Sequence, residues 1–84
     1  MTLNEIKPGE KAIILSINTN EDIKRRFQDI GIIENTIVEC IGKSPAGDPK
    51  AYIIRGAVIA IRSDDGKKIS VVKKESWNAW KFHD

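Results

Sequence analysis

The sequence is poor in the side chains that build most catalytic and metal sites. Its 84 residues include one histidine, His83, and one cysteine, Cys40. Metal binding and nucleophilic catalysis need several such groups close together, and Asp64 and Asp65 are expected to form a solvated turn instead of a ligand pair. The sequence also lacks a complete glycine-rich phosphate-loop motif. We therefore expect no catalytic residue, no protein-held metal, no cofactor and no enzyme activity.

The lone cysteine and the absence of long apolar runs limit the class of protein further. Cys40 has no partner for an internal disulfide, which suits a reducing compartment. Its place in "TIVECI" predicts a small buried apolar residue. No apolar run approaches the roughly 18 residues of a membrane span, and the start "MTLNEIKPGEK" lacks the apolar core of a signal peptide. These features predict a cytoplasmic protein without membrane insertion.

Aromatic residues and excess charge are also scarce. Aromatic side chains make up 6% of the sequence, and 14 basic residues are interleaved with 12 acidic ones for a net charge of +2. Nucleic-acid-binding barrels combine a basic stripe with stacking aromatic rings, so we expect no nucleic-acid partner. The alternative of a nucleic-acid-binding small barrel stays open, with six basic candidates: Arg25, Arg26, Arg55, Arg62, Lys67 and Lys68.

One segment has the pattern of an amphipathic helix, at about residues 20–30. Asn20 is a good N-cap because its side-chain oxygen can accept a hydrogen bond from a backbone amide of the first turn. Gly31 is expected to end the helix, since glycine adopts the left-handed conformation of a C-cap. The pattern predicts one apolar stripe facing the core, made of Ile23, Phe27 and Ile30.

The rest of the chain reads as short strands separated by turns. Residues 12–17 alternate, with Ile13, Leu15 and Ile17 expected on one face and Ala12, Ile14 and Ser16 on the other. Further strands are expected in 36–41, on both sides of a sharp bend or bulge at Gly56, and in "ISVVK", with turns at Glu34–Asn35 and "SDDGKK". No strand–helix–strand repeat is present. The order predicts a mainly β fold, a small closed or nearly closed barrel with one inserted α-helix.

A longer loop, "SPAGDPKAY", joins two of these strands. Residues 44–47 match a type I turn, with serine first, proline second and glycine fourth. The connection is longer than the tightest hairpin requires, and long loops on a rigid scaffold often bind partners. We therefore select Asp48, Lys50 and Tyr52 as candidate partner-binding residues.

Several of these stretches together resemble the FeoA family of small SH3-like β-barrels. The matching pieces are "LNEIKPGEKAIILSI", "RRFQDIGI", "SPAGDPKAYIIRGAVIAIR" and "KKISVV", in the family's order and spacing. The resemblance implies a FeoA-like domain over about residues 1–74 and leaves 75–84 as a tail of unknown role. Two departures are Glu34–Asn35, where the family often has Pro-Gly, and "SDDG", where it often has an acidic-alanine pair.

The resemblance implies a cytosolic, non-enzymatic accessory of bacterial ferrous iron uptake. Its partner would be FeoB, a membrane ferrous transporter with a GTP-binding domain, so recruitment to the inner face of the membrane is expected. The same fold also occurs in metal-dependent repressors, which leaves a regulatory SH3-like module as an alternative. The sequence leaves weak homo-oligomerisation open.

Two further groups of residues are candidates for partner binding. Arg25 falls off the apolar stripe and Arg26 lies along its edge, next to Ile30. Both are expected on a solvated helix face that could contact the transporter's nucleotide-binding domain. Trp77 and Trp80 would share a face if that part is helical. We favour packing of these tryptophans back on the barrel, with a partner anchor or a membrane-surface contact as alternatives.

Overall fold

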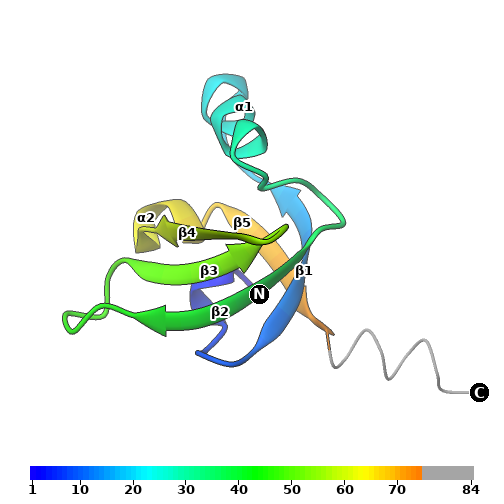
Figure 1. Cartoon of the computed structure of the whole chain (residues 1–84). Coiled ribbons are helices and arrows are strands. Elements are labelled where there is room, and N and C mark those ends of the chain that lie inside the picture. The colour runs from blue at the N-terminus through cyan, green and yellow to red at the C-terminus, as the bar shows by residue number, and fades with distance from the viewer. Residues whose placement is uncertain (75–84) are drawn as a thin grey trace, which may run out of the picture.

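The computed structural model describes residues 1–74 and shows one curved antiparallel sheet with short helices at its margins (Figure 1). The strands pair in the order β4-β3-β2-β1-β5. They are β1 (Lys11–Ile17), β2 (Ile37–Lys43), β3 (Lys50–Ile54), β4 (Ala57–Ile61) and β5 (Ile69–Lys73). The helices are η1 (Leu3–Glu5), α1 (Glu21–Asp29) and α2 (Ser63–Gly66). The predicted mainly β fold with one inserted helix is confirmed.

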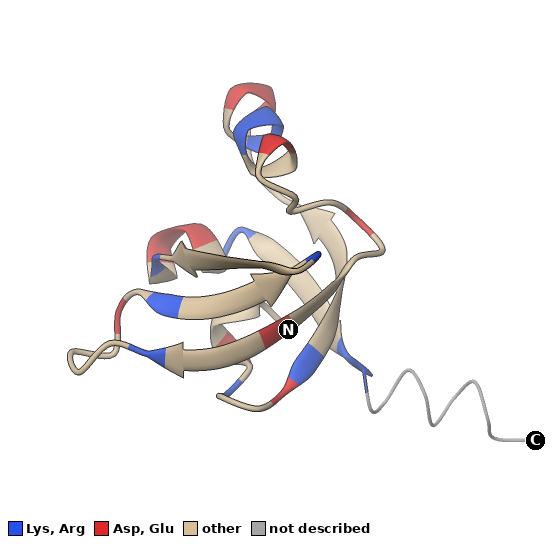
Figure 2. Cartoon of the chain, viewed as in Figure 1, with Lys and Arg blue, Asp and Glu red and all other residues tan. Residues whose placement is uncertain are grey.

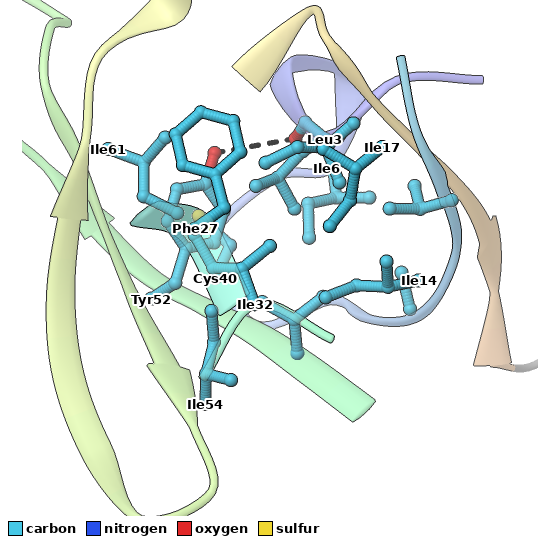
Figure 3. Packing of buried hydrophobic residues seen from close by; sticks show 14 residues of the cluster. Leu3, Ile6, Ile14, Ile17, Phe27, Ile32, Cys40, Tyr52, Ile54 and Ile61 are labelled. Atoms are coloured by element: carbon cyan, nitrogen blue, oxygen red, sulfur yellow. Dashed lines mark hydrogen bonds between the residues drawn. The ribbon is translucent and has the colours of Figure 1, made fainter. Parts of the chain in front are cut away.

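The concave side of the sheet encloses a single apolar core (Figure 3). Every strand contributes to it, and Leu3 and Ile6 from the N-terminal segment are completely buried there. Tyr52 is the largest fully buried side chain. Cys40 is buried and free, as the sequence predicts. Because the core is small, each of these side chains makes up a large part of it.

The ends of α1 follow the sequence closely. The Asn20 side chain accepts a hydrogen bond from the Ile23 amide at 3.0 Å, so the predicted N-cap is confirmed. Gly31 has a φ of 99°, and the Ile32 amide donates back to the Phe27 carbonyl at 2.9 Å. This is the hydrogen-bond pattern of a Schellman C-cap. The chain therefore turns sharply at the residue where the sequence predicts the end of the helix.

The predicted apolar stripe of α1 is wrong at its last position. Phe27 is buried and Ile23 is partly buried, but Ile30 is 52% exposed. The reason is the same C-cap: Ile30 is the cap residue, and the reversal at Gly31 brings Ile32 into the core in its place. Ile30 therefore becomes part of the surface.

The predicted alternation of buried and exposed residues does not continue along the whole of β1. Ala12 and Ile14 face the core as one set, but Ile17 joins them, while Leu15 is exposed. The pairing of β1 with β5 shifts between Ile14 and Ser16. A bulge inserts an extra residue and so exchanges the faces of all later residues.

The turns agree with the sequence apart from one. Asn35 has a φ of 68°, and Arg55 and Gly56 have φ values of 53° and 84°, which form a two-residue hairpin turn between β3 and β4. The predicted sharp bend at Gly56 is confirmed. The stretch "SDDG" was expected as a turn and is instead the short helix α2. Its N-terminal carboxylates favour a helical turn because they lie at the positive end of the helix dipole.

The Asn20 cap gives a first testable expectation. Replacing Asn20 by alanine removes the hydrogen bond to the Ile23 amide and should cost about 1 kcal/mol of unfolding free energy. Urea denaturation followed by circular dichroism measures this loss. The Asn20→Ser variant, which keeps a capping oxygen, should retain most of the stability. An equal loss in both variants would contradict the capping role.

Candidate functional site

The helix α1 carries the first pair of candidate residues on its outer side. Arg25 and Arg26 are exposed, whereas Phe27 of the same helix is buried and packs against the barrel. The helix stands beyond one end of the sheet, and its basic residues lie between acidic residues nearer its two ends (Figure 2). Neither arginine belongs to any of the four ion pairs found within residues 1–74. Both guanidinium groups are therefore available to a partner.

The structure adds an apolar residue that the sequence assigned to the core. Ile30 lies one turn after Arg26 on the helix and is half exposed. We call the group Arg25, Arg26 and Ile30 the helix surface. Arginine is enriched at protein interfaces, and the buried centre of an interface is apolar, so arginines beside an exposed isoleucine fit that composition. The sequence offered one signal for this exposure, the glycine directly after Ile30.

Asp48 in the long loop holds the start of α2. Its Oδ1 accepts a hydrogen bond from the Ser63 amide at 2.9 Å, and its Oδ2 accepts one from Ser63 Oγ at 3.2 Å. The carboxylate thus caps a helix that is fifteen residues away along the chain. The Ser44–Gly47 turn is present, with a 2.8 Å hydrogen bond from the Gly47 amide to the Ser44 carbonyl.

Lys50 ties β3 to the N-terminal segment. Its Nζ donates hydrogen bonds to the Asn4 carbonyl at 2.6 Å and to the Ile6 carbonyl at 3.1 Å. These bonds satisfy carbonyl groups near η1 that the sheet does not pair. Partner binding by Asp48 and Lys50 remains a prediction, but the contacts of both residues give them roles inside the domain.

The partner-binding prediction for Tyr52 needs correction. The side chain is 1% exposed, and its hydroxyl donates a 3.3 Å hydrogen bond to the Leu3 carbonyl inside the core (Figure 3). Burial, with smaller contributions from Cys40 and Asp48, raises the pKa of Tyr52 to about 12. Strand pairing decides this orientation, because Tyr52 lies opposite the buried Cys40 of β2. Tyr52 is therefore a core residue.

Other candidates are separated by the fold or lie outside its described part. Arg62 precedes α2, Lys67 pairs with Asp64 at 3.4 Å, and Lys68 pairs with Asp65 at 3.7 Å. The six basic candidates therefore do not form one uninterrupted stripe with α1. Trp77 and Trp80 lie outside residues 1–74.

Within residues 1–74, no group of three or more histidine, cysteine or acidic side chains could hold a metal ion. No helix there is long and apolar enough to cross a membrane.

Comparisons with known proteins now identify the class. Residues 1–73 match the family model of the FeoA domain, and the chain belongs to the FeoA family. One relative is the putative Fe(2+) transport protein A of Campylobacter jejuni. It is 35% identical over 71 residues, which are 84% of this chain and 96% of that protein. Another is the Fe(2+) transport protein A/Fe(2+) transporter FeoB fusion protein of Porphyromonas gingivalis, 25% identical over 84% of this chain and only 8% of that protein.

Solved structures confirm the SH3-like fold. A FeoA-like protein from Clostridium acetobutylicum superposes with a TM-score of 0.80 at 32% identity, over 87% of this chain and 85% of that one. The zinc complex of FeoA from Stenotrophomonas maltophilia, a prokaryotic SH3 domain protein, superposes with a TM-score of 0.74 at 26% identity, over 86% of this chain and 89% of that one. A manganese-dependent transcriptional repressor superposes with a TM-score of 0.76 at 19% identity, and the match covers 41% of the repressor chain. That likeness concerns the fold alone.

Proposed function

We propose that this protein is a non-enzymatic accessory of bacterial ferrous iron uptake, acting in the cytoplasm. The observation that carries the proposal is the match to the FeoA domain over residues 1–73. The whole-length similarity to Fe(2+) transport protein A of Campylobacter jejuni supports the same role, because the alignment covers 96% of that protein. The Stenotrophomonas FeoA, which shares the fold, is described as a candidate ferrous iron transport activating factor.

The proposed partner is the cytosolic part of a FeoB-type membrane transporter. In Porphyromonas gingivalis, Fe(2+) transport protein A and the transporter FeoB are fused in one polypeptide. The fusion keeps the FeoA-like domain at a high effective concentration next to its transporter. A FeoA-like domain that is not fused to its transporter has to bind the transporter through a surface to reach the same proximity. Protein–protein contact is therefore the activity to be tested.

The helix surface is the best-supported contact region of this chain. It combines two arginines that form no ion pair within residues 1–74 and one exposed isoleucine on a helix that stands away from the sheet (Figure 2). Arginine donates bidentate hydrogen bonds to carboxylates and is enriched in binding hot spots. A contact with the transporter's nucleotide-binding domain would also allow an arginine to stabilise negative charge during GTP hydrolysis.

A pull-down with the transporter's cytosolic part tests the proposal. The Arg25→Glu/Arg26→Glu variant should bind at least tenfold more weakly, because two favourable charges become repulsive toward an acidic partner surface. Asp48→Ala and Lys50→Ala should be measured in parallel to test the loop. The matched control is Lys7→Glu/Lys43→Glu, which makes the same change in net charge at exposed positions outside α1.

The control variant should bind within about twofold of the wild-type chain, since its substitutions lie away from the helix surface. Unchanged binding by the arginine variant would remove the helix surface from the proposal. Failure of the wild-type chain to bind the complete transporter, together with unchanged GTP turnover and iron uptake, would contradict the proposed function itself.

A further inference from the structure

The sheet has two edge strands, and only one of them is covered within residues 1–74. At the β5 edge, Thr2 forms a bridge with Ser70, and the Val71 amide donates to the Met1 carbonyl at 2.8 Å. The N-terminal segment thus extends the sheet on that side. In the described part of the chain, β4 forms backbone hydrogen bonds to β3 and to no other segment. Within residues 1–74, its outer edge is therefore open.

The strand β4 has none of the features that usually protect an open edge. Its sequence, Ala-Val-Ile-Ala-Ile, contains no charge and no proline, and its pairing with β3 runs without a bulge. Val58 is 67% exposed, more than any other large apolar side chain of the described residues. In natural proteins, lysine, proline or bulges normally prevent an edge strand from pairing with other chains, because an open apolar edge readily binds another strand. The composition of β4 favours such pairing.

The hairpin turn decides which backbone groups point outward. A two-residue turn is flanked by a hydrogen-bonded pair, which here is Ile54 with Ala57. Hydrogen-bonded and non-hydrogen-bonded pairs then alternate along the ladder. Ala57, Ile59 and Ile61 consequently bond to β3. Val58 and Ala60 direct their N–H and C=O groups to the open edge.

We propose that the open edge of β4 binds β4 of a second copy of this chain, antiparallel, about a twofold axis at Ile59. This register places Val58 of one copy opposite Ala60 of the other, at both ends of the contact. Each such pair exchanges two hydrogen bonds, so all four outward N–H groups and all four outward C=O groups are paired. Registers shifted along the strand leave some of these groups without a partner.

Side-chain sizes fit the same register. Val58 meets Ala60 and Ala57 meets Ile61, so a larger side chain lies opposite a smaller one in these pairs, and the two Ile59 side chains meet at the twofold axis. The turn that carries Arg55 lies beside the start of α2 of the other copy. An isologous contact of this kind closes on itself and gives a dimer with one continuous ten-stranded sheet.

Sedimentation equilibrium of the full chain between about 5 µM and 1 mM tests the proposal. The average mass should rise reversibly from 9.4 kDa toward twice that value. Val58→Lys introduces a charge at the edge and should weaken dimerisation at least tenfold. Leu15→Lys is the matched control, since Leu15 is also an exposed apolar strand residue but lies on β1, three strands away from β4 in the sheet. It should leave dimerisation unchanged.

Amide hydrogen exchange gives a second measurement with residue resolution. The Val58 and Ala60 amides should become protected as the concentration rises, whereas Ala57 and Ile59 are already bonded to β3 at all concentrations. A monomeric mass up to 1 mM, or equal effects of Val58→Lys and Leu15→Lys, would overturn the proposal. Protection of Val58 and Ala60 only after addition of the transporter's cytosolic part would also overturn it, because the occupant would then be a transporter strand. A monomer that still binds the transporter would leave the proposed function intact.

Discussion

Replacing Tyr52 by alanine is expected to remove about 3–5 kcal/mol of unfolding free energy. Among residues 1–74, Tyr52 is the largest fully buried side chain, and it packs in the core with aliphatic residues such as Leu3 and Ile54. A domain of this size has roughly 4–12 kcal/mol of stability in total. Urea denaturation followed by far-ultraviolet circular dichroism should therefore show a greatly reduced midpoint, with part of the population unfolded before urea is added.

The Tyr52→Phe variant separates the ring from the hydroxyl. It keeps the buried ring and loses only the 3.3 Å hydrogen bond to the Leu3 carbonyl, so its cost should be about 1 kcal/mol. Similar losses in Tyr52→Phe and Tyr52→Ala would contradict the assignment of Tyr52 as a packing residue.

The same residue predicts how stability depends on alkaline pH. Folding raises the pKa of Tyr52 from about 10 in the unfolded chain to about 12, because burial disfavours the charged phenolate. The resulting stabilisation of the folded state is complete below pH 10 and is lost as the pH rises toward 12. Absorbance at 295 nm reports this directly, since the chain has a single tyrosine. Titration of the folded protein near pH 10 would contradict the burial, and Tyr52→Phe provides the control.

Replacing Phe27 by alanine is expected to be nearly as costly, at about 3–4 kcal/mol. Phe27, which lies in the core (Figure 3), is the buried residue through which α1 packs against the barrel. Ile23 of the same helix is only partly buried. The loss should therefore release the helix from the barrel as well as destabilise the whole domain. Amide exchange should increase more in Glu21–Asp29 than in the strands, and binding to the transporter should weaken even at temperatures where the sheet remains folded.

The control for Phe27 is an exposed residue of the same helix. Gln28→Ala, on the solvent side of α1, should change the unfolding free energy by less than about 0.5 kcal/mol. If Phe27→Ala behaves like Gln28→Ala, or if the strands and α1 become equally exchangeable, α1 is not held by Phe27.

Local chemistry explains the parts of the fold that the sequence predicted correctly. Asn20 and Gly31 define the ends of α1 through hydrogen bonds and dihedral angles within a few residues. Asn35 and Gly56 likewise mark turns because their conformational freedom is a property of the residue itself. The lone cysteine and the short apolar segments also predicted a small core with a buried thiol, which the structure contains.

The candidate site depended more on contacts between distant parts of the chain. The sequence indicates Tyr52 as a partner-binding candidate, but its position opposite Cys40 on the neighbouring strand turns the ring inward. Asp48 and Lys50 bond to Ser63 and to the Asn4 carbonyl, which are far away in sequence. Ile30 became exposed because Ile32 occupies the core instead. Apart from Gly31, which directly follows Ile30, no local pattern signals these outcomes.

The sequence by itself determined the helix, the turns, the mainly β class and the family, because caps, turns and motifs are set by neighbouring residues. Only the tertiary structure decided which face of each strand is buried, since the bulge in β1 exchanges faces partway along it. It also decided which edge of the sheet stays open: the N-terminal segment covers β5, while β4 has no second neighbour among residues 1–74. Strand order depends on pairing between segments far apart in the chain, and no short stretch of sequence specifies it.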